Sequence, residues 1–121
     1  MDQSNVLIFV YGSLKRGLAL HEHLNGCTFF GCSATKPNYR LFDCGDYPGM
    51  VPAATNGARI LGEVYEVAVD CLANLDVVEA VDEGLFVRRN VELEDEFNRA
   101  VEAYFYCRPT GHLTELGNSW P

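Results

Sequence analysis

An apolar run that ends in a glycine turn and two cations is the first candidate site. Residues 6–11 are all apolar or aromatic, as expected for a strand that is buried on both faces. The turn and the two cations that follow are Gly12, Ser13, Leu14, Lys15 and Arg16. Gly12 lets the backbone turn or approach a ligand closely, and the N–H groups of residues 12–14 could converge on a carboxylate or phosphate. An ordinary turn after a strand has the same composition and remains an alternative.

The glycine spacing of this turn argues against a nucleotide phosphate as the anion. Gly12 and Gly17 match the glycines of the motif G-x-x-x-x-G-K-[ST], but Leu18 and Ala19 stand where that motif has its lysine and its hydroxyl. The dinucleotide motif G-x-G-x-x-G is absent from the chain. We therefore expect a small anion that is bound locally.

A carboxylate on the apolar face of an expected helix is the second candidate site. Asp70 can cap a helix that runs to about residue 80. Glu79 follows Leu75 by four residues and Leu72 by seven, so it projects from the stripe that faces the core. Desolvation there would raise its pKa above the usual value of about 4.3, which suits a general acid or base near neutral pH.

Two other interpretations of Glu79 stay open. In the last turn of a helix its side chain could reach solvent, or it could pair with a cation such as Arg88. Asp82 and Glu83 follow in an expected loop and are interpreted as solvated charges.

The elements that must position these residues are short. Strands are expected at residues 5–11, 27–34, 38–43, 60–69, 86–93 and 100–108, a short helix or turn at 17–24, a loop at 45–49 and a hairpin tip at 94–98. Together with the helix at 70–80, this pattern predicts an α+β domain with a small curled or closed sheet and helices at its ends.

Composition narrows the classes of partner. The net charge of −8 disfavours nucleic acid and anionic membranes, and no segment has the features of a signal peptide or a membrane span, so we expect a cytoplasmic protein. Five cysteines without a C-x-x-C pair predict buried, reduced thiols rather than disulfides or a zinc site. A cysteine nucleophile beside one of the histidines stays possible, and His21 and His23 are interpreted as surface residues rather than metal ligands.

Several of these motifs together resemble a known family. Tyr11 to Gly17 resembles the signature Y-G-[ST]-L-K-R-G of the γ-glutamylcyclotransferase-like superfamily, close to its γ-glutamylamine cyclotransferase and AIG2-like branch. Further matches, in chain order, are Tyr47-Pro48-Gly49, Gly62 to Tyr65, Leu75-Asp76-x-x-Glu79, Gly84-x-Phe86-x-Arg88 and Phe105-Tyr106. The resemblance therefore extends over most of the chain.

The resemblance implies a single domain over residues 1–121, with a small mixed β-barrel of five to six or more strands and peripheral short helices. It implies an enzyme that converts a γ-glutamyl amide to 5-oxoproline and a free amine without metal or cofactor, with Glu79 as the general acid/base. Its substrate-binding residues would be Tyr11, Gly12, Ser13, Leu14, Arg88 and Tyr106. The expected partner is a small-molecule γ-glutamyl substrate, neither nucleic acid nor membrane, and the chain would act as a monomer or weak homodimer.

Two departures and three alternatives accompany this interpretation. Ala80 stands where the family usually has glycine, and Phe86 where it usually has tyrosine, which leaves the substrate's identity open. A noncatalytic module of the same fold that binds small carboxylates would use the same loop. A protein-interaction domain would need a broad exposed apolar patch, and a cysteine hydrolase would depend on a thiol.

Overall fold

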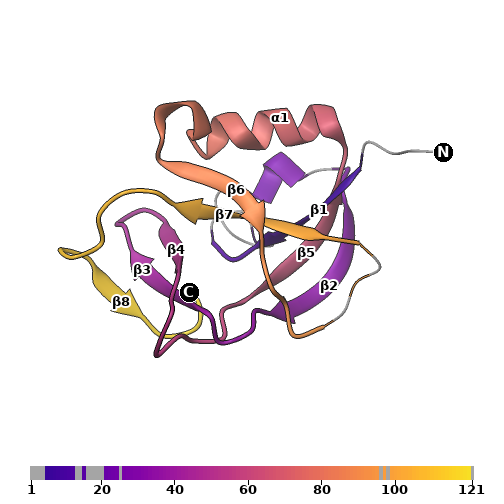
Figure 1. Cartoon of the computed structure of the whole chain (residues 1–121). Coiled ribbons are helices and arrows are strands. Elements are labelled where there is room, and N and C mark those ends of the chain that lie inside the picture. Colours follow the sequence, from indigo (N-terminus) through magenta and orange to yellow (C-terminus); the bar gives the residue numbers. More distant parts are fainter. Residues whose placement is uncertain are drawn as a thin grey trace.

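The computed structural model describes residues 5–12, 15, 21–24, 26–95, 97 and 99–120. Eight strands and three helical segments form in this part of the chain (Figure 1). A five-stranded sheet has the order β2-β5-β1-β7-β6, and a three-stranded sheet has the order β4-β3-β8. The strands of the larger sheet are β1 (Val6–Val10), β2 (Thr28–Ala34), β5 (Leu61–Val67), β6 (Phe86–Asn90) and β7 (Val101–Tyr106). Those of the smaller sheet are β3 (Tyr39–Asp43), β4 (Pro48–Pro52) and β8 (Thr114–Leu116).

Strand β1 occupies the centre of the larger sheet. It pairs antiparallel with β5 and parallel with β7, where Leu7 lies opposite Val101. Its side chains alternate between two apolar clusters, with Leu7 and Phe9 in one and Ile8 and Val10 in the other. The prediction of a strand buried on both faces is therefore confirmed.

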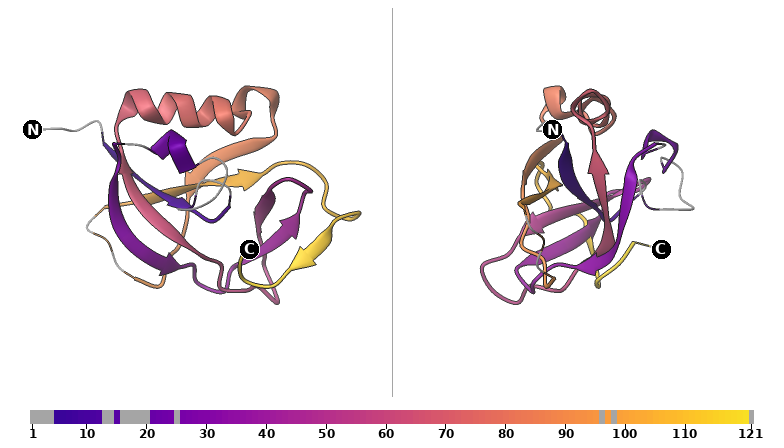
Figure 2. Two further views of the ribbon diagram at one scale, coloured as in Figure 1. Left: turned by 180° about the vertical axis from the view of Figure 1, so that it is seen from behind. Right: turned by 90° about the vertical axis from the view of Figure 1, so that its right-hand side faces the viewer.

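Each face of the larger sheet has its own cover (Figure 2). The helix α1 (Val69–Val78) packs on one face through Leu72 and Leu75, beside η1 (His21–Leu24). The smaller sheet packs on the other face through residues such as Leu41 and Met50. The short helix η2 (Val81–Glu83) follows α1 and leads into β6. None of the helices in the described ranges has the length and apolar character needed to cross a bilayer.

The mixed α+β fold agrees with the expectation, whereas the closed barrel is not confirmed. The larger sheet is open, because β2 and β6 are its edge strands. The smaller sheet forms a separate ladder, and the hydrogen-bonded order of the strands never returns to its starting point.

Several expected boundaries were wrong. Helix α1 begins at Val69 with Ala68 as its N-cap and no side-chain cap, so Asp70 lies in the first turn instead. The expected loop at 45–49 is only partly a loop, because β4 starts at Pro48. Strands β3 and β4 form a tight hairpin, in which the Cys44 N–H donates to the Tyr47 carbonyl (3.0 Å). Pro48 can begin β4 because proline is tolerated at the first position of a strand at a sheet edge. Strand β8 was missed because three residues are too few for a periodic pattern.

Candidate active site

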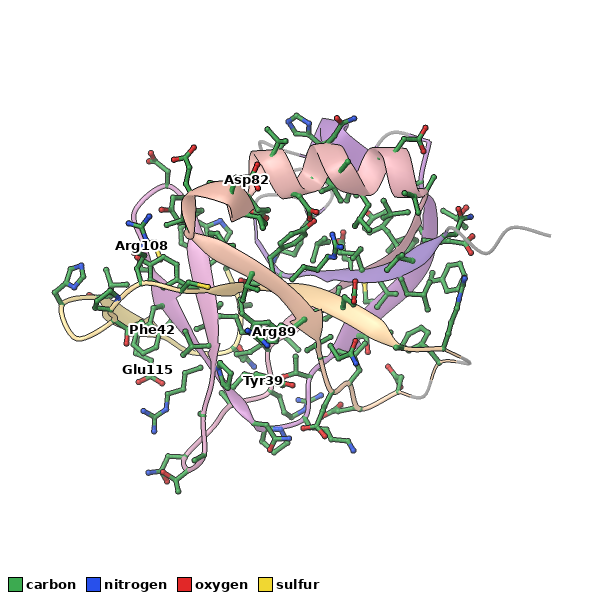
Figure 3. All side chains as sticks on the ribbon, turned by 45° about the horizontal axis from the view of Figure 1, so that its top comes forward. Tyr39, Phe42, Asp82, Arg89, Arg108 and Glu115 are labelled. Atoms are coloured by element: carbon green, nitrogen blue, oxygen red, sulfur yellow. The ribbon has the colours of Figure 1, made fainter. Side chains whose placement is uncertain are left out.

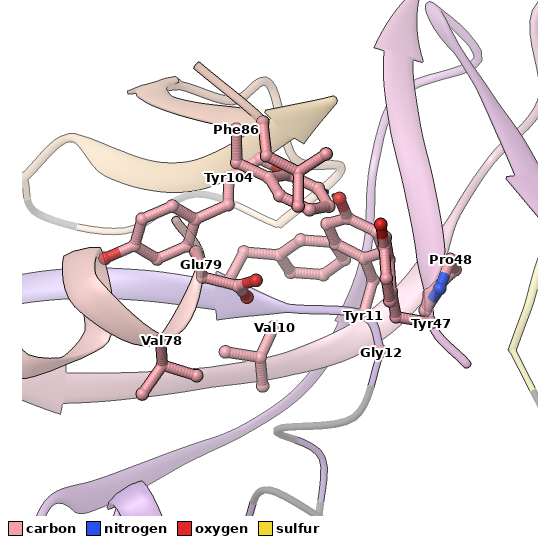
Figure 4. A pocket seen from close by; sticks show the side chains of 11 residues that line it. Val10, Tyr11, Gly12, Tyr47, Pro48, Val78, Glu79, Phe86 and Tyr104 are labelled. Atoms are coloured by element: carbon pink, nitrogen blue, oxygen red, sulfur yellow. Dashed lines mark hydrogen bonds between the residues drawn. The ribbon is translucent and has the colours of Figure 1, made fainter. Parts of the chain in front are cut away.

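The C-terminal end of β1 and the C-terminal end of α1 meet at a cavity of about 90 Å³ (Figure 4). Most of its walls are apolar or aromatic, and Glu79 is the one charged residue among the described residues that line it. The lining residues are Phe9, Val10, Tyr11, Gly12, Tyr47, Pro48, Val78, Glu79, Leu85, Phe86 and Tyr104. Tyr11 and Gly12 of the first candidate segment therefore line the same cavity as Glu79 of the second.

Glu79 lies at the point where α1 ends. It is the C-cap residue, and its backbone N–H donates to the Leu75 carbonyl at 2.9 Å. Leu72 and Leu75 are buried on the same side of the helix, which confirms the predicted stripe. The carboxylate points into the cavity (Figure 4) and has no hydrogen bond or ion pair with any other residue that the structure describes. Burial alone raises its pKa to about 7, so both protonation states are populated near neutral pH.

Tyr11 lines the same cavity as Glu79 and is held in place by two hydrogen bonds. Its hydroxyl donates to the Tyr104 carbonyl oxygen (2.6 Å) and accepts from the Met50 N–H (3.1 Å), so it joins β1, β7 and β4. Burial, and secondarily the negative charge of Glu79, raises the pKa of this phenol well above its usual range. Tyr11 is therefore a neutral structural anchor at the edge of the site.

Gly12 is required by a close contact. A Cβ atom at this position would lie 2.7 Å from Cγ of Pro48, which is too close for any residue other than glycine without movement. The Lys15 N–H donates to the Gly12 carbonyl at 3.0 Å, so the chain turns back directly after β1. Ser13 and Leu14 lie outside the described residues, and convergence of the amides of 12–14 on an anion stays a prediction.

Arg88 lies outside the cavity lining and is engaged elsewhere. Its Nη1 donates to both carboxylate oxygens of Asp76 (2.7 and 2.8 Å), and its Nε donates to Glu102 (3.1 Å). The sequence left open an ion pair between Arg88 and Glu79, but the structure pairs Arg88 with Asp76 and Glu102 instead. A direct role of Arg88 in substrate binding stays a prediction, and its guanidinium would have to leave Asp76 to perform it.

Tyr106 is also absent from the residues that line the cavity. It lies on the same face of β7 as Tyr104, and its ring contacts Phe86 at a centroid distance of 5.6 Å. Tyr104 is the cavity residue that sequence reasoning missed. Alternation along β7 places both tyrosines on one face, and only the position of the α1 end shows which of them borders the cavity.

The turn after Glu79 has unusual backbone geometry. Ala80 adopts φ 52° and ψ 44°, the left-handed conformation that favours glycine. The Leu85 N–H donates to the Ala80 carbonyl at 3.2 Å, which closes the loop between α1 and β6. Asp82 and Glu83 lie in the short helix η2 rather than in the expected loop, but both are exposed, as predicted for solvated charges, and Figure 3 shows Asp82.

The thiols and histidines give no second site in the described part of the chain. All five cysteines are free, Cys32 and Cys107 are exposed and the other three are partly exposed, so the expectation of buried thiols was wrong. None of them lines the cavity. Among the described residues, no group of three or more histidine, cysteine or acidic side chains could hold a metal ion.

Comparison with known proteins places the chain in a family. The sequence profile of the family described as "Gamma-glutamyl cyclotransferase, AIG2-like" matches residues 8–121. The chain belongs to this family. It is 32% identical over 113 residues to "Gamma-glutamylaminecyclotransferase C" of Danio rerio, a match that covers 84% of this chain and 74% of that protein. A Vibrio cholerae relative is 43% identical over 75 residues, and the match covers 62% of this chain and 63% of the relative's length.

The fold of the chain is also similar to that of a solved AIG2-like protein. The crystal structure of an AIG2-like protein from Mus musculus superposes with a TM-score of 0.75 at 25% identity, covering 98% of this chain and 90% of that one. Within the family framework, the two departures noted above flank the site: Ala80 follows Glu79 directly, and Phe86 forms part of the cavity wall. The left-handed conformation of residue 80 gives a physical reason why glycine suits that position.

Proposed function

We propose that this chain is a γ-glutamylcyclotransferase, an enzyme of the transferase or lyase type that converts a γ-glutamyl amide to 5-oxoproline and a free amine. The α-nitrogen of the substrate attacks the γ-carbonyl carbon, a ring C–N bond forms, and the bond to the attached amine breaks. Glu79 accepts a proton from the α-ammonium group and returns one to the departing nitrogen. The observation that carries the proposal is the Glu79 carboxylate, the one charged group among the described residues of a mostly apolar cavity, with a pKa raised by burial to about 7.

The raised pKa is what makes Glu79 suitable for this step. The α-ammonium group of the substrate is a weaker acid than Glu79, and each unit of pKa mismatch costs roughly 1.4 kcal/mol in the proton transfer. A carboxylate at the ordinary pKa of 4.5 would face a mismatch larger by about 2.5 than Glu79 with its pKa of about 7, or roughly 3.4 kcal/mol more. Desolvation therefore lowers the thermodynamic cost of the proton transfer substantially. General acid/base groups typically contribute about 10²–10⁴-fold to the rate.

The rest of the chemistry is a matter of orientation. The nucleophile and the carbonyl belong to the same molecule, and holding them in contact can be worth roughly 7–11 kcal/mol. The rigid walls around Gly12 and Tyr11 support such a role, because close contacts and two hydrogen bonds fix them. In this proposal the backbone amides of residues 12–14 bind the α-carboxylate or the developing oxyanion, as the resemblance implies.

A panel of γ-glutamyl amides tests the proposal. Each is incubated with the protein in ¹⁸O-labelled water, and the products are analysed by mass spectrometry. We expect unlabelled 5-oxoproline plus the free amine, and Glu79→Gln should reduce the rate by at least 100-fold, within the usual range for an acid/base residue. Glu83→Gln makes the same chemical change at an exposed position and should retain the full rate.

Two results would contradict the proposal. Glutamate with ¹⁸O in its γ-carboxylate would mean that water is the nucleophile and that the chain is a hydrolase. Saturable binding of the same amides without any product would favour the alternative of a noncatalytic carboxylate-binding module.

A further inference from the structure

Asp76, the carboxylate that precedes Glu79 on α1, belongs to a hydrogen-bonded network. Asp76 precedes Glu79 by three residues on α1, a spacing that places two side chains on the same side of a helix. Asp76 accepts hydrogen bonds from the Tyr104 hydroxyl (2.6 Å) and from Arg88 (2.7 and 2.8 Å). Arg88 lies directly opposite Tyr104 in the β6–β7 register and also donates to Glu102. Two strands of the sheet thus anchor the last turns of α1.

Tyr104 connects this network to the rest of the cavity. Its ring borders the cavity (Figure 4), its hydroxyl donates to Asp76 (2.6 Å), and its carbonyl oxygen accepts the hydrogen bond from Tyr11 (2.6 Å). One residue therefore ties the wall formed by Tyr11 to the helix that ends at Glu79. A displacement of α1 along the sheet would break the bond from Tyr104 to Asp76 before it altered the apolar packing, because hydrogen bonds depend more steeply on geometry.

We infer that Asp76 and Arg88 are positioning residues for the proposed reaction: together they anchor the end of α1 and cancel each other's charge beside Glu79. The inference rests on the proposed function, in which Glu79 must stay free of an ion pair to act as a base near neutral pH. Without Arg88, the Asp76 carboxylate would face Glu79 as an uncompensated like charge. Without Asp76, the guanidinium would be free to attract Glu79 and stabilise its ionised form.

The other titratable groups that border the cavity carry no charge that would shift the titration of Glu79. Those that border the cavity in the described structure are the phenols Tyr11 on β1, Tyr47 before β4 and Tyr104 on β7. Burial raises the pKa of all three, so they are neutral at the pH values of interest. The charges that can act on Glu79 from the network are those of Asp76, Arg88 and Glu102.

The test measures the titration of Glu79 directly, by the ¹³C chemical shift of its carboxyl carbon. Arg88→Gln should raise its pKa by roughly 0.5 to 1, the effect of one unit charge at the separation of roughly 6 Å typical of side chains one helical turn apart, in a largely solvated setting. Asp76→Asn should lower it, and the double variant should return it to the wild-type value. Arg88→Lys keeps the charge and serves as the matched control, which should leave the titration unchanged.

Kinetics with a turned-over γ-glutamyl amide provide the second measurement. The acidic limb of the pH profile of kcat/KM should move in parallel with the titration, with KM within about twofold of wild type. An unchanged Glu79 titration in Arg88→Gln would overturn the inference. A large rise in KM that the double variant fails to reverse would show that Arg88 binds substrate instead. If no amide is turned over, the proposed function fails, while the NMR titration still decides on the network.

Discussion

The Glu79 carboxylate, which has no partner among the described residues, should make the stability of this protein depend on pH in an unusual direction. The pKa of Glu79 is 4.5 when exposed and about 7 in the folded state. The folded state therefore holds this proton more tightly than the unfolded chain. Stability from this group is fully present below pH 4.5, falls as the pH rises towards 7, and is absent above that. Most carboxylates in ion pairs act in the opposite sense.

The size of the effect follows from the same two values. Between pH 5 and pH 8 the linkage relation gives a loss of about 2.5 kcal/mol in the free energy of unfolding, with partial exposure of the carboxylate reducing it. Glu79→Gln removes the titrating group and with it this loss. The variant should therefore gain on wild type by up to this amount as the pH rises, whatever its absolute stability at pH 5.

Urea unfolding at pH 5, 6, 7 and 8 measures the difference. Wild type, Glu79→Gln and Glu83→Gln are compared, because Glu83 is an exposed glutamate only four residues along the chain. We expect the Glu83→Gln curve to parallel that of wild type and the Glu79→Gln curve to diverge from both. Parallel curves for all three proteins would refute the desolvation argument, and with it the physical basis for Glu79 as a base near neutral pH.

Two further predictions concern the frame of the cavity. Ala80→Gly should stabilise the protein by roughly 1 kcal/mol, measured by urea unfolding, because glycine adopts the left-handed conformation of this residue without steric cost; a destabilised variant would contradict the geometry of the turn. Tyr11→Phe should destabilise it by roughly 1–3 kcal/mol, since the Met50 N–H and the Tyr104 carbonyl both lose their buried partner, and an unchanged unfolding midpoint would argue against that anchor.

The features of this molecule that were predictable from the sequence are local. The continuous apolar run through β1 identified a strand buried on both faces, and the spacing of Leu72, Leu75 and Glu79 identified the inward-facing carboxylate. Each depends on residues within two or three turns or one strand length of one another. The glycine of the first turn was also recognisable, although the reason for it, the contact with Pro48, is not local.

What escaped prediction depends on contacts between distant segments. The parallel pairing of β1 with β7 joins residues more than 90 positions apart, and no short-range pattern indicates it. The choice of Tyr104 rather than Tyr106 as a cavity residue follows from where α1 ends over the sheet. The same is true of Arg88, whose partner could be named only once β6 was in register with β7 beneath the helix.

Under the inference above, the position of Arg88 gives a reason why Glu79 has no ion pair among the described residues. An arginine that paired with Glu79 would stabilise the ionised form and lower its pKa towards or below 4.5, which would make it a weak base at neutral pH. Asp76, one turn earlier on the same helix face, binds that guanidinium with both oxygens. The Tyr104 hydroxyl then holds Asp76 in place from the cavity side. We infer that this arrangement leaves desolvation as the influence that raises the pKa of Glu79.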